Sequence, residues 1–323
     1  MQSRIALMLA AWVLAWGSAC SVAAQEWPSR PVKVIVPFGA GSTPDIVTRL
    51  LADKLQHRLG QPFVVENKPG ASGNIGTDAV AKAEPDGYTI GISIGGPLAI
   101  NPLLFGKLTY DPAKDFAYVT LLATQPNVLA VNASLNAHSV SELIALLKAN
   151  PGKFNFGSIG NGSLSHLAME AIMLASGSSL VHIPYASSPQ AMTALLRGDV
   201  HVVCLPALGV TPHAANPNAR ILAITTAQRS DLVPGVPTLK ENGIDVEADA
   251  WNGIIAPANT PPAIVARLHD EIGAVLALPD MREKLTTQVM EPIPSTPAAF
   301  RARIEADIAR WAPVIRAANI KVN

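Results

Sequence analysis

The stretch VKVIVPFGAGSTPD, residues 32–45, decides the fold class. Its first half, Val32 to Phe38, is an almost unbroken apolar run and predicts a buried strand. The two glycines that follow predict a tight turn, and an apolar residue then recurs at every fourth position up to Gly60, which predicts a helix. The recurring residues are Val47, Leu51, Leu55 and Leu59. A strand, a glycine turn and a helix form one βα unit of an α/β protein.

The same alternation continues along the chain. Strands are expected at 63–66, 88–94, 128–131, 154–158, 181–183, 200–205 and 221–225, and helices near 77–83, after 139, from 164, up to 197 and through the tail from 260. The helix starts are predicted from a capping box at Ser139 and Glu142 and from the cap-then-proline pairs Thr43-Pro44, Ser188-Pro189, Thr260-Pro261 and Thr296-Pro297. Strands that alternate with helices predict mostly parallel sheets, which bind ligands at the carboxyl ends of their strands.

Residues 1–24 are expected to be a secretory signal peptide, because Arg4 precedes an apolar run from Ile5 to Trp16. That run is too short for the roughly 20 residues that cross a bilayer. Lipid attachment at Cys20 is disfavoured, because Gly17 stands where lipoprotein signals carry an aliphatic residue. Export to the periplasm as a soluble protein is therefore expected.

Composition narrows the class of protein further. Lys plus Arg and Asp plus Glu each number 24, without a basic cluster, which argues against binding to nucleic acid or to a charged membrane surface. Loss of residues 1–24 would leave Cys204 as the sole cysteine, so no internal disulfide is expected. The remaining chain of about 300 residues is longer than one core usually supports, which favours two lobes.

The segment Gly39 to Asp45 has the features of an anion site. Its glycines let the backbone approach a ligand, Thr43 is expected to cap the helix, and the free N–H groups and helix dipole favour an anion. A carboxylate fits there without an arginine. The alternative is an ordinary strand-to-helix turn whose caps serve only folding.

A second segment, Ser158 to His166, repeats this arrangement, with three glycines and Ser163 as the expected cap. His166 would lie in the first helical turn, where it either donates to a ligand or bonds the loop backbone. Tyr185 precedes a third helix start and is either a ligand contact or a packing residue. Two glycine-rich loops that face each other would hold both sides of one ligand.

Enzymatic functions fit the sequence less well. Gly39-Ala40-Gly41 after a strand, with Glu66 ending the next strand, partly matches a dinucleotide-binding motif, but Pro44 replaces its third glycine. Ser163 and His166 lie close together, yet the Gly-x-Ser-x-Gly elbow of serine hydrolases is absent. Metal-ligand spacing is also absent. No catalytic residue, metal or cofactor is expected, although an envelope enzyme acting on a small carboxylate stays an alternative.

Several short motifs are specific in combination: WPSRP at 27–31, VENKPGA at 65–71, PDGYT at 85–89, HIPY at 182–185, VPT at 236–238, Trp251, and AP at 256–257. Through them the chain resembles the Bug-type periplasmic receptors of tripartite tricarboxylate transporters. The resemblance covers nearly the whole chain after residue 24.

The resemblance implies a two-lobed α/β periplasmic binding protein, type II-like, with its ligand cleft between the lobes. Lobe 1 would comprise residues 25–124 plus 250–323 and lobe 2 residues 125–249, with crossings near Thr124 and Asp249. It implies a monomeric solute-binding protein that closes on a small carboxylate and delivers it to the membrane subunits of a tripartite tricarboxylate-type transporter. Ligand sensing without transport stays an alternative.

The residues expected to bind the ligand are Phe38, Gly39, Ala40, Gly41, Ser42, Thr43, Asp45, Ser93, Ser158, Gly160, Asn161, Gly162, Ser163, His166, Tyr185, Ala186, Ser187, Pro206 and Ala207. The chain departs from the family at Ala186-Ser187, where a basic residue and a glycine are common, and at 204–207, where an aspartate is common. The far end of the pocket is therefore expected to be less polar. A dicarboxylate or aromatic carboxylate is favoured over an amino acid, since no acid is evident to hold an ammonium group.

Overall fold

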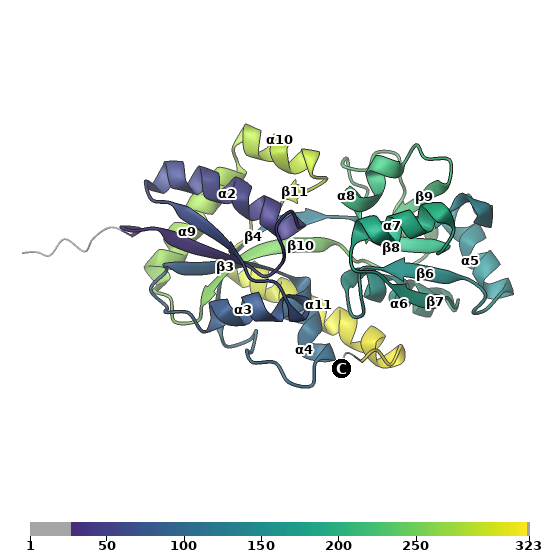
Figure 1. The fold of residues 1–323 in the computed structure, drawn as a ribbon, viewed down its shortest axis with the longest axis horizontal. Coiled ribbons are helices and arrows are strands. Elements are labelled where there is room, and N and C mark those ends of the chain that lie inside the picture. Colours follow the sequence, from purple (N-terminus) through teal and green to yellow (C-terminus); the bar gives the residue numbers. More distant parts are fainter. Residues whose placement is uncertain (1–26, 322–323) are drawn as a thin grey trace, which may run out of the picture.

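The computed structural model describes residues 27–321 as two α/β lobes placed side by side (Figure 1). The expected signal peptide, residues 1–24, and the cysteine at position 20 lie outside the described residues. Between residues 27 and 321, no helix is both long enough and apolar enough to cross a bilayer.

The first lobe is built on a six-stranded sheet in the order β11-β4-β10-β3-β1-β2. Its strands are β1 (Val32–Val36), β2 (Phe63–Asn67), β3 (Thr89–Ile94), β4 (Phe116–Gln125), β10 (Ala250–Pro257) and β11 (Glu291–Pro292). β1 pairs in parallel with β2 and β3, whereas β10 is antiparallel to β3 and β4, and β11 is antiparallel to β4.

Helices cover both faces of this sheet and bury its apolar side chains. One face packs against α2 (Thr43–Leu59), α9 (Pro262–Leu276) and α10 (Pro279–Thr287). The other face packs against α3 (Asn74–Ala81), a π-helical turn at Gly96–Ile100 that continues into α4 (Asn101–Leu104), and the long α11 (Pro297–Ala317). A short 3-10 turn, Ala71–Gly73, precedes α3.

The second lobe holds a five-stranded sheet in the order β7-β6-β8-β5-β9. Its strands are β5 (Asn127–Asn132), β6 (Asn155–Ser158), β7 (Val181–Pro184), β8 (Val202–Pro206) and β9 (Ala219–Ile224). On one face lie α5 (Val140–Ala149) and α6 (Leu164–Ser176), and on the other α7 (Ser188–Arg197) and α8 (Ala207–Val210). Three 3-10 turns complete the lobe at Ala133–Leu135, Thr211–His213 and Lys240–Asn242.

Both sheets are mixed, so the prediction of mostly parallel sheets is wrong. β6 is parallel to β7 and β8, but β5 is antiparallel to β8 and β9. In the first lobe, the antiparallel pairs all involve β4 or β10, two strands that the sequence pattern did not reveal.

The chain crosses between the two sheets twice. It leaves the first sheet at Gln125 and enters the second at Asn127, and it returns at Ala250. Backbone hydrogen bonds from Thr225 N to Asn127 O and from Ala248 N to Thr225 O hold the two crossing segments together. The crossings are therefore adjacent strands with few conformational degrees of freedom.

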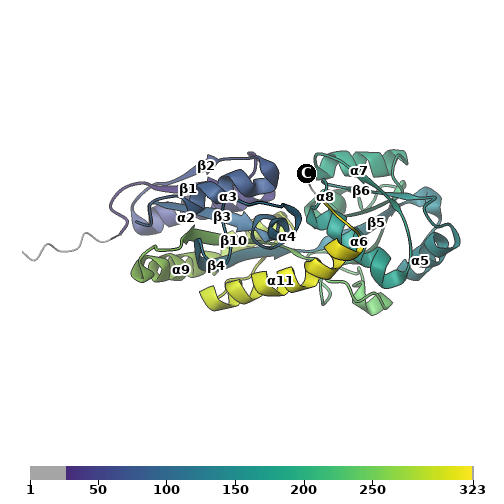
Figure 2. The same cartoon turned by 90° about the horizontal axis from the view of Figure 1, so that it is seen from below.

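Helix α11 makes a further connection that was not expected. Figure 2 shows it running along the underside from the first lobe toward the second. Near its C-terminal end, Trp311, Val314 and Ile315 join a buried cluster with residues of α6 such as Leu167 and Met169. One apolar cluster thus spans elements of both lobes.

In three of the four cap-then-proline pairs, the helix begins one residue away from the prediction. Proline occupies either the first or the second helical position in these helices, so it does not fix which residue is the cap. The N-caps are Ser42, Ser187 and Pro261, where Thr43, Ser188 and Thr260 were expected.

The other predicted caps are confirmed. The Ser139 hydroxyl accepts a hydrogen bond from Glu142 N, and the carboxylate of Glu142 accepts one from His138 N, which is the reciprocal arrangement of a capping box. The hydroxyl of Thr296 accepts a hydrogen bond from Ala299 N at the start of α11.

Candidate binding site between the two sheets

Strand direction brings the loops of the first lobe to one edge of its sheet. β1, β2 and β3 are parallel, so their carboxyl ends at Val36, Asn67 and Ile94 lie at the same edge. β4 runs in the same direction, because both β3 and β4 are antiparallel to β10. β4 therefore also ends at this edge, at Gln125, where the chain leaves for the second lobe.

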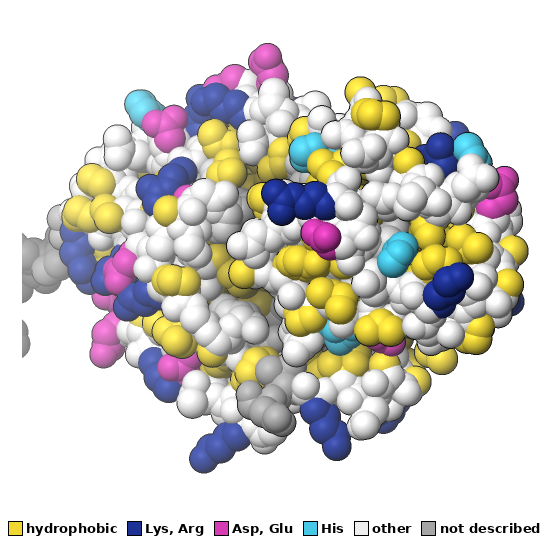
Figure 3. Space-filling view, turned by 45° about the vertical axis from the view of Figure 1, so that its right-hand side comes forward, with side chains coloured by type: hydrophobic (Ala, Val, Ile, Leu, Met, Phe, Trp, Pro, Cys, Tyr) yellow, Lys and Arg dark blue, Asp and Glu magenta, His cyan; other side chains and the backbone are white. Residues whose placement is uncertain are grey.

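The second sheet turns its corresponding edge toward the first. Asn127, the first residue of β5, pairs with Pro206, the last residue of β8. β6 and β7 are parallel to β8 and end at the same edge. Since the crossing at Pro126 joins the two edges directly, the loops after β1 and β3 face the loops after β6, β7 and β8. The space-filling view shows the surface hollowed along the boundary between the two halves (Figure 3).

The first loop, Phe38 to Ser42, connects β1 to α2 and borders open space. A Cβ atom placed on Gly39 or Gly41 would meet no atom within 4 Å, and Gly41 has φ +78°, a conformation that favours glycine. Ala40 is exposed and Phe38 is half-buried. Phe38 packs beside Gly73, on which a Cβ atom would come within 2.8 Å of its ring.

Ser42 is the N-cap of α2, but its side chain makes no capping hydrogen bond. Its Oγ is buried and has no partner among the described residues. Thr43 and Asp45 lie in the first turn of the helix. The N–H groups at a helix start have no intrahelical partners, and the Ser42 hydroxyl beside them has none either. These groups are suited to form hydrogen bonds with a bound anion.

The carboxylate of Asp45, at the start of α2, holds the first loop through hydrogen bonds. This carboxylate accepts hydrogen bonds from Gly41 N at 2.9 Å, Asn67 Nδ2 at 2.8 Å and Arg49 Nε at 3.1 Å. Burial opposes ionisation of this carboxyl, but the hydrogen bonds from Arg49, Gly41 and Asn67 outweigh it and lower the pKa of Asp45 below its usual value. The charge is neutralised within its own lobe, so Asp45 supports the loop rather than offering a free charge.

The second loop, Ser158 to Ser163, connects β6 to α6. Ser163 caps α6, accepting a hydrogen bond from His166 N at 3.3 Å and donating one to Gly160 O at 2.7 Å. Gly160 has φ +115°, and a Cβ placed there would meet nothing within 4 Å. Asn161 is exposed, whereas Gly162 is buried.

Ser158 and His166 face the interior rather than open space. Ser158 is fully buried, and its hydroxyl contacts His182 Nε2 at 2.6 Å. His166 accepts a hydrogen bond from Gly162 N at its Nδ1, at 3.1 Å. Of the two roles left open for His166, the structure favours bonding to the loop backbone.

Two further loops complete the edge of the second sheet. After β7, the half-buried Tyr185 lies against Gly157 of β6, and Ala186 is exposed. Ser187 caps α7, and the side-chain oxygen Oε1 of Gln190 accepts a hydrogen bond from Ala186 N. After β8 come Pro206 and Ala207, with Cys204 buried behind them; burial raises the pKa of the Cys204 thiol to about 12.

Ser93 is fully buried in β3, one residue before the end of the strand, and lies within 3.3 Å of the hydroxyl of Thr77 on α3. The structure therefore places the predicted residues at or next to two facing edges. The side chains of Asp45, Ser93, Ser158 and His166 are engaged within their own lobe.

Three residues with a role in shaping the loops were not identified from sequence. Asn67 Nδ2 donates to both Asp45 and Phe38 O, and Arg49 bonds both Asp45 and Asn67. Asn67 follows β2 directly, and a polar residue at a strand end was the available signal. His182 gave no such signal, because it lies within a strand of mostly apolar residues.

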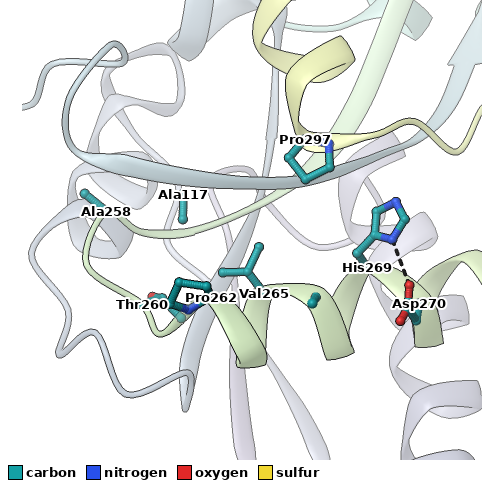
Figure 4. Close-up of a pocket in the computed structure, with 9 residues that line it drawn as sticks. Ala117, Ala258, Thr260, Pro262, Val265, His269, Asp270 and Pro297 are labelled. Atoms are coloured by element: carbon teal, nitrogen blue, oxygen red, sulfur yellow. Dashed lines mark hydrogen bonds and ion pairs between the residues drawn. The ribbon is translucent and has the colours of Figure 1, made fainter.

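Two cavities within residues 27–321 lie away from these loops. One, of about 430 Å³, lies between β4, the start of α9 and the start of α11 (Figure 4). Its lining is largely apolar, and the side chains of His269 and Asp270 lie 3.1 Å apart, Nδ1 to Oδ1. The other, of about 390 Å³, lies between α6 and α11. Neither touches a predicted ligand-binding residue.

The facing loops are rich in backbone donors and poor in cations. In the described part of the chain, no lysine or arginine side chain is hydrogen-bonded to residues 38–42 or 158–163. No group of three or more His, Cys, Asp and Glu residues between 27 and 321 is arranged to hold a metal ion. Backbone N–H groups at two helix starts are thus the main features that could bind an anion.

The chain is similar to known proteins in sequence and in fold. Residues 47–320 match the family model described as "Tripartite tricarboxylate transporter family receptor". Protein BugT of Bordetella pertussis is 36% identical over 322 residues, covering 99% of each chain.

Two of the similar solved structures contain carboxylates. R. palustris Rpa4515 with adipate is 36% identical, with a TM-score of 0.82, over 92% of this chain and 99% of that one. MatC from Rhodopseudomonas palustris with bound malate is 30% identical, with a TM-score of 0.77, over 90% of this chain and 100% of that one. The chain therefore belongs to the tripartite tricarboxylate transporter receptor family of periplasmic binding proteins.

Proposed function

We propose that this protein captures a small carboxylate in the periplasm and delivers it to the membrane subunits of a tripartite tricarboxylate-type transporter. The observation that carries the proposal is the pair of glycine-rich helix starts, 38–42 and 158–163, at facing sheet edges joined by Pro126. The adipate and malate named with two family members support the ligand class. Export by a signal peptide at 1–24 and a monomeric state are parts of the same proposal.

Each helix start supplies a modest share of the binding free energy. A helix N-terminus contributes about 0.3–1 kcal/mol, and up to about 2 kcal/mol when partly buried. Hydrogen bonds to a charged group add roughly 1.5–3 kcal/mol each. Several such bonds from both lobes are consistent with micromolar affinity, about −8 kcal/mol, after the cost of ordering the ligand. One loop alone does not reach that value, so binding requires both lobes.

We propose a dicarboxylate or an aromatic carboxylate over an amino acid. The acid nearest the first loop, Asp45, is already satisfied by three hydrogen-bond donors. Ala186 and Pro206 carry no charge at the far edge of the site. An ammonium group would lack a carboxylate partner there, whereas an apolar or aromatic body would lie against Tyr185 and Pro206.

A ligand panel tests the ligand class. Purified protein is heated with adipate, malate, benzoate, aspartate and glutamate in turn, and the shift in Tm is measured. We expect the dicarboxylates or benzoate to raise Tm by several degrees, because ligands stabilise the state that they bind. Stabilisation by aspartate or glutamate alone would overturn the choice of ligand class. Native mass spectrometry of the protein purified without denaturation provides an independent check, because a ligand retained during purification reports its own mass.

Substitution Gly39→Leu tests the place of binding. Gly39 has no positive φ and open space around its Cβ position, so leucine should be accommodated in the fold while filling the space that a ligand needs. We expect a loss of affinity of tenfold or more with Tm of the free protein almost unchanged. Gly273→Leu on α9, also a position with open space, is the matched control. Equal affinity for both variants would mean that the first loop is not the site.

A further inference from the structure

Two histidine rings are stacked behind the second loop. The rings of His166 on α6 and His182 on β7 lie 3.8 Å apart between centroids, at an angle of 11°. The ring of Phe156 on β6 lies beside both, with centroids 4.8 Å from His182 and 6.1 Å from His166. His166 is buried and His182 is half-buried, so the stacked rings lie inside the second lobe, beneath the loop.

The two rings hold the loop at separate points. His182 Nε2 is 2.6 Å from Ser158 Oγ, and Ser158 Oγ in turn accepts a hydrogen bond from Gly160 N at 3.2 Å. His166 Nδ1 accepts a hydrogen bond from Gly162 N at 3.1 Å. The backbone directions of both glycines, and hence of the N–H groups at the start of α6, therefore depend on the two imidazoles.

We propose that His166 and His182 are positioning residues that shape the Ser158–Ser163 loop for anion binding only while both rings are neutral, so that acidification weakens ligand binding. The inference rests on the proposed function, because it concerns the affinity of that same site. Neither ring needs to touch the ligand.

The reason lies in which nitrogen carries a proton. Nδ1 of His166 accepts from the Gly162 amide, so a proton on Nδ1 would set two N–H groups against each other and break this bond. The titratable groups recorded against His166 are His182 and Glu170, whose carboxylate lies 3.4 Å from its Nε2. The Glu170 carboxylate is placed to favour the tautomer with its hydrogen on Nε2, which leaves Nδ1 free as the acceptor.

His182 adds a second proton-dependent contact. Burial, and then the neighbouring His166, lower the pKa of His182 from 6.5 to about 4. The ring therefore stays neutral near pH 7. Its contribution to stability is present above pH 6.5 and is lost as the pH falls through about 4. Protonation of these rings in acid should therefore weaken ligand binding and lower the stability of the protein.

Conservative variants separate the role of these rings from a packing role. In His166→Asn the amide oxygen occupies the Nδ1 position, and in His182→Gln the amide occupies the Nε2 position, so both hydrogen bonds can persist without titration. The double variant H166N/H182Q should bind adipate within a few-fold of the parent protein at pH 7.5. A double leucine variant at the same positions should lose affinity at every pH.

The matched control is His201→Asn. His201 is also a half-buried histidine whose pKa is lowered by burial, and its Nδ1 lies 2.7 Å from Asn155 Oδ1 at the opposite end of β6. His201 directly precedes β8 and lies at the edge of the sheet away from the loop. Its substitution should leave the pH dependence of binding unchanged.

Two measurements test the proposal between pH 7.5 and 3, one unit below the pKa of about 4 of His182. Adipate affinity should fall about tenfold in the parent protein and the H201N control, relative to H166N/H182Q, since one pH unit below a linked pKa costs up to tenfold. Comparison with that variant removes the titration of adipate itself. In ligand-free protein, the amide NMR signals of Gly160 and Gly162 should shift over the same range and stay fixed in H166N/H182Q.

The two readouts distinguish failure of this inference from failure of the proposed function. Identical pH profiles for the parent protein and H166N/H182Q, or glycine signals that do not titrate with the histidines, would overturn the role of the rings. If adipate binds at no pH while the glycine signals still titrate, the rings shape the loop but the ligand class is wrong, and the proposal of acid-weakened carboxylate binding fails with it.

Discussion

Asp45 determines the shape of the first loop, although it offers no free charge to a ligand. Three donors from separate parts of the chain converge on its carboxylate: the Gly41 amide, Asn67 and Arg49. The residue was predicted from its place after the glycines. Its partner Asn67 is 22 residues away along the chain, so this set of hydrogen bonds could be recognised only from the three-dimensional arrangement of the strands.

Replacement of Asp45 by alanine should therefore affect both folding and binding. The substitution leaves the Gly41 amide and the Asn67 side chain without their acceptor, which costs on the order of 1–3 kcal/mol for buried polar groups. We expect the free energy of unfolding, measured in urea at pH 7, to fall by this amount, and the affinity for the ligand to be weaker. Asp53→Ala, at an exposed position on the same helix, should change stability by less than about 0.5 kcal/mol.

The pH dependence of this prediction has a defined sign. The pKa of Asp45 is lowered in the folded state, so its ionised form stabilises the protein above the unfolded pKa of 3.8. That contribution disappears as the pH falls below 3.8. The difference in stability between the parent protein and D45A should thus be largest near neutral pH and shrink toward pH 3; a difference that is equally large at pH 3 would contradict the assigned charge state.

At the scale of elements, the helix starts were predictable, and so were the caps Ser139, Ser163 and Thr296, but the caps beside Pro44 and Pro189 were not. Both Ser42 and Ser187 precede a hydroxyl residue and a proline, and either hydroxyl residue could have been the cap. The N–H groups of the whole first turn lack intrahelical partners, so proline costs little at more than one position there. Local sequence therefore gives the helix start to within one residue.

The strands β4 and β10 escaped prediction for a different physical reason. The residues of both are buried almost throughout, because helices cover both faces of the sheet. A strand buried on both faces shows no alternation of apolar and polar residues. These two strands lead to the crossings between lobes, so the site could be assembled from sequence only through the family resemblance.

Helix α11 is fixed to the crossing segment through a buried ion network. Arg303 Nη2 contacts Asp249 at 2.7 Å, and its Nε contacts Asp307 at 3.1 Å. Asp307 also accepts a hydrogen bond from the indole of Trp251 at 2.7 Å, and Asp249 accepts one from Thr124. The network joins both crossing segments to one helix.

Loss of Arg303, which joins the two carboxylates, should lower the free energy of unfolding. Arg303→Leu leaves the largely buried carboxylate of Asp249 without a cation and leaves Asp307 with only the longer contact to Arg310 at 3.5 Å, and breaking a buried pair in this way destabilises a protein by on the order of 3 kcal/mol. We expect this loss in denaturant unfolding at pH 7. Arg316→Leu, at an exposed position in the last turn of α11, is the matched control and should be close to neutral. Equal effects of the two substitutions would argue against a structural role for the network.

At the scale of the whole molecule, binding of one ligand by two lobes requires that they move together and come apart reversibly. Two crossing strands and α11 are the main connections, and they differ in kind; Val289 of the first lobe also packs against a buried cluster of the second. The strands are held by backbone hydrogen bonds, whereas α11 contacts the second lobe through apolar side chains around Trp311 and through an ion pair between Arg310 and Glu247 at 3.5 Å. An apolar contact is not directional and tolerates small sliding motions, which a hydrogen-bonded strand pair does not. We infer that α11 keeps the lobes coupled while the strands act as the pivot.

Trp311→Ala tests this coupling. Trp311 is almost fully buried, and its removal should cost about 3–5 kcal/mol. If α11 couples the lobes, the loss should also split or broaden thermal unfolding measured by calorimetry, because each lobe has its own sheet and can then unfold separately. Phe300→Ala is the control on the same helix: its ring is fully buried against Tyr118 and Trp251 within the first lobe. It should lower Tm by a similar amount while preserving a single transition. A single sharp transition in W311A, with equal calorimetric and van't Hoff enthalpies, would show that the two strands alone couple the lobes.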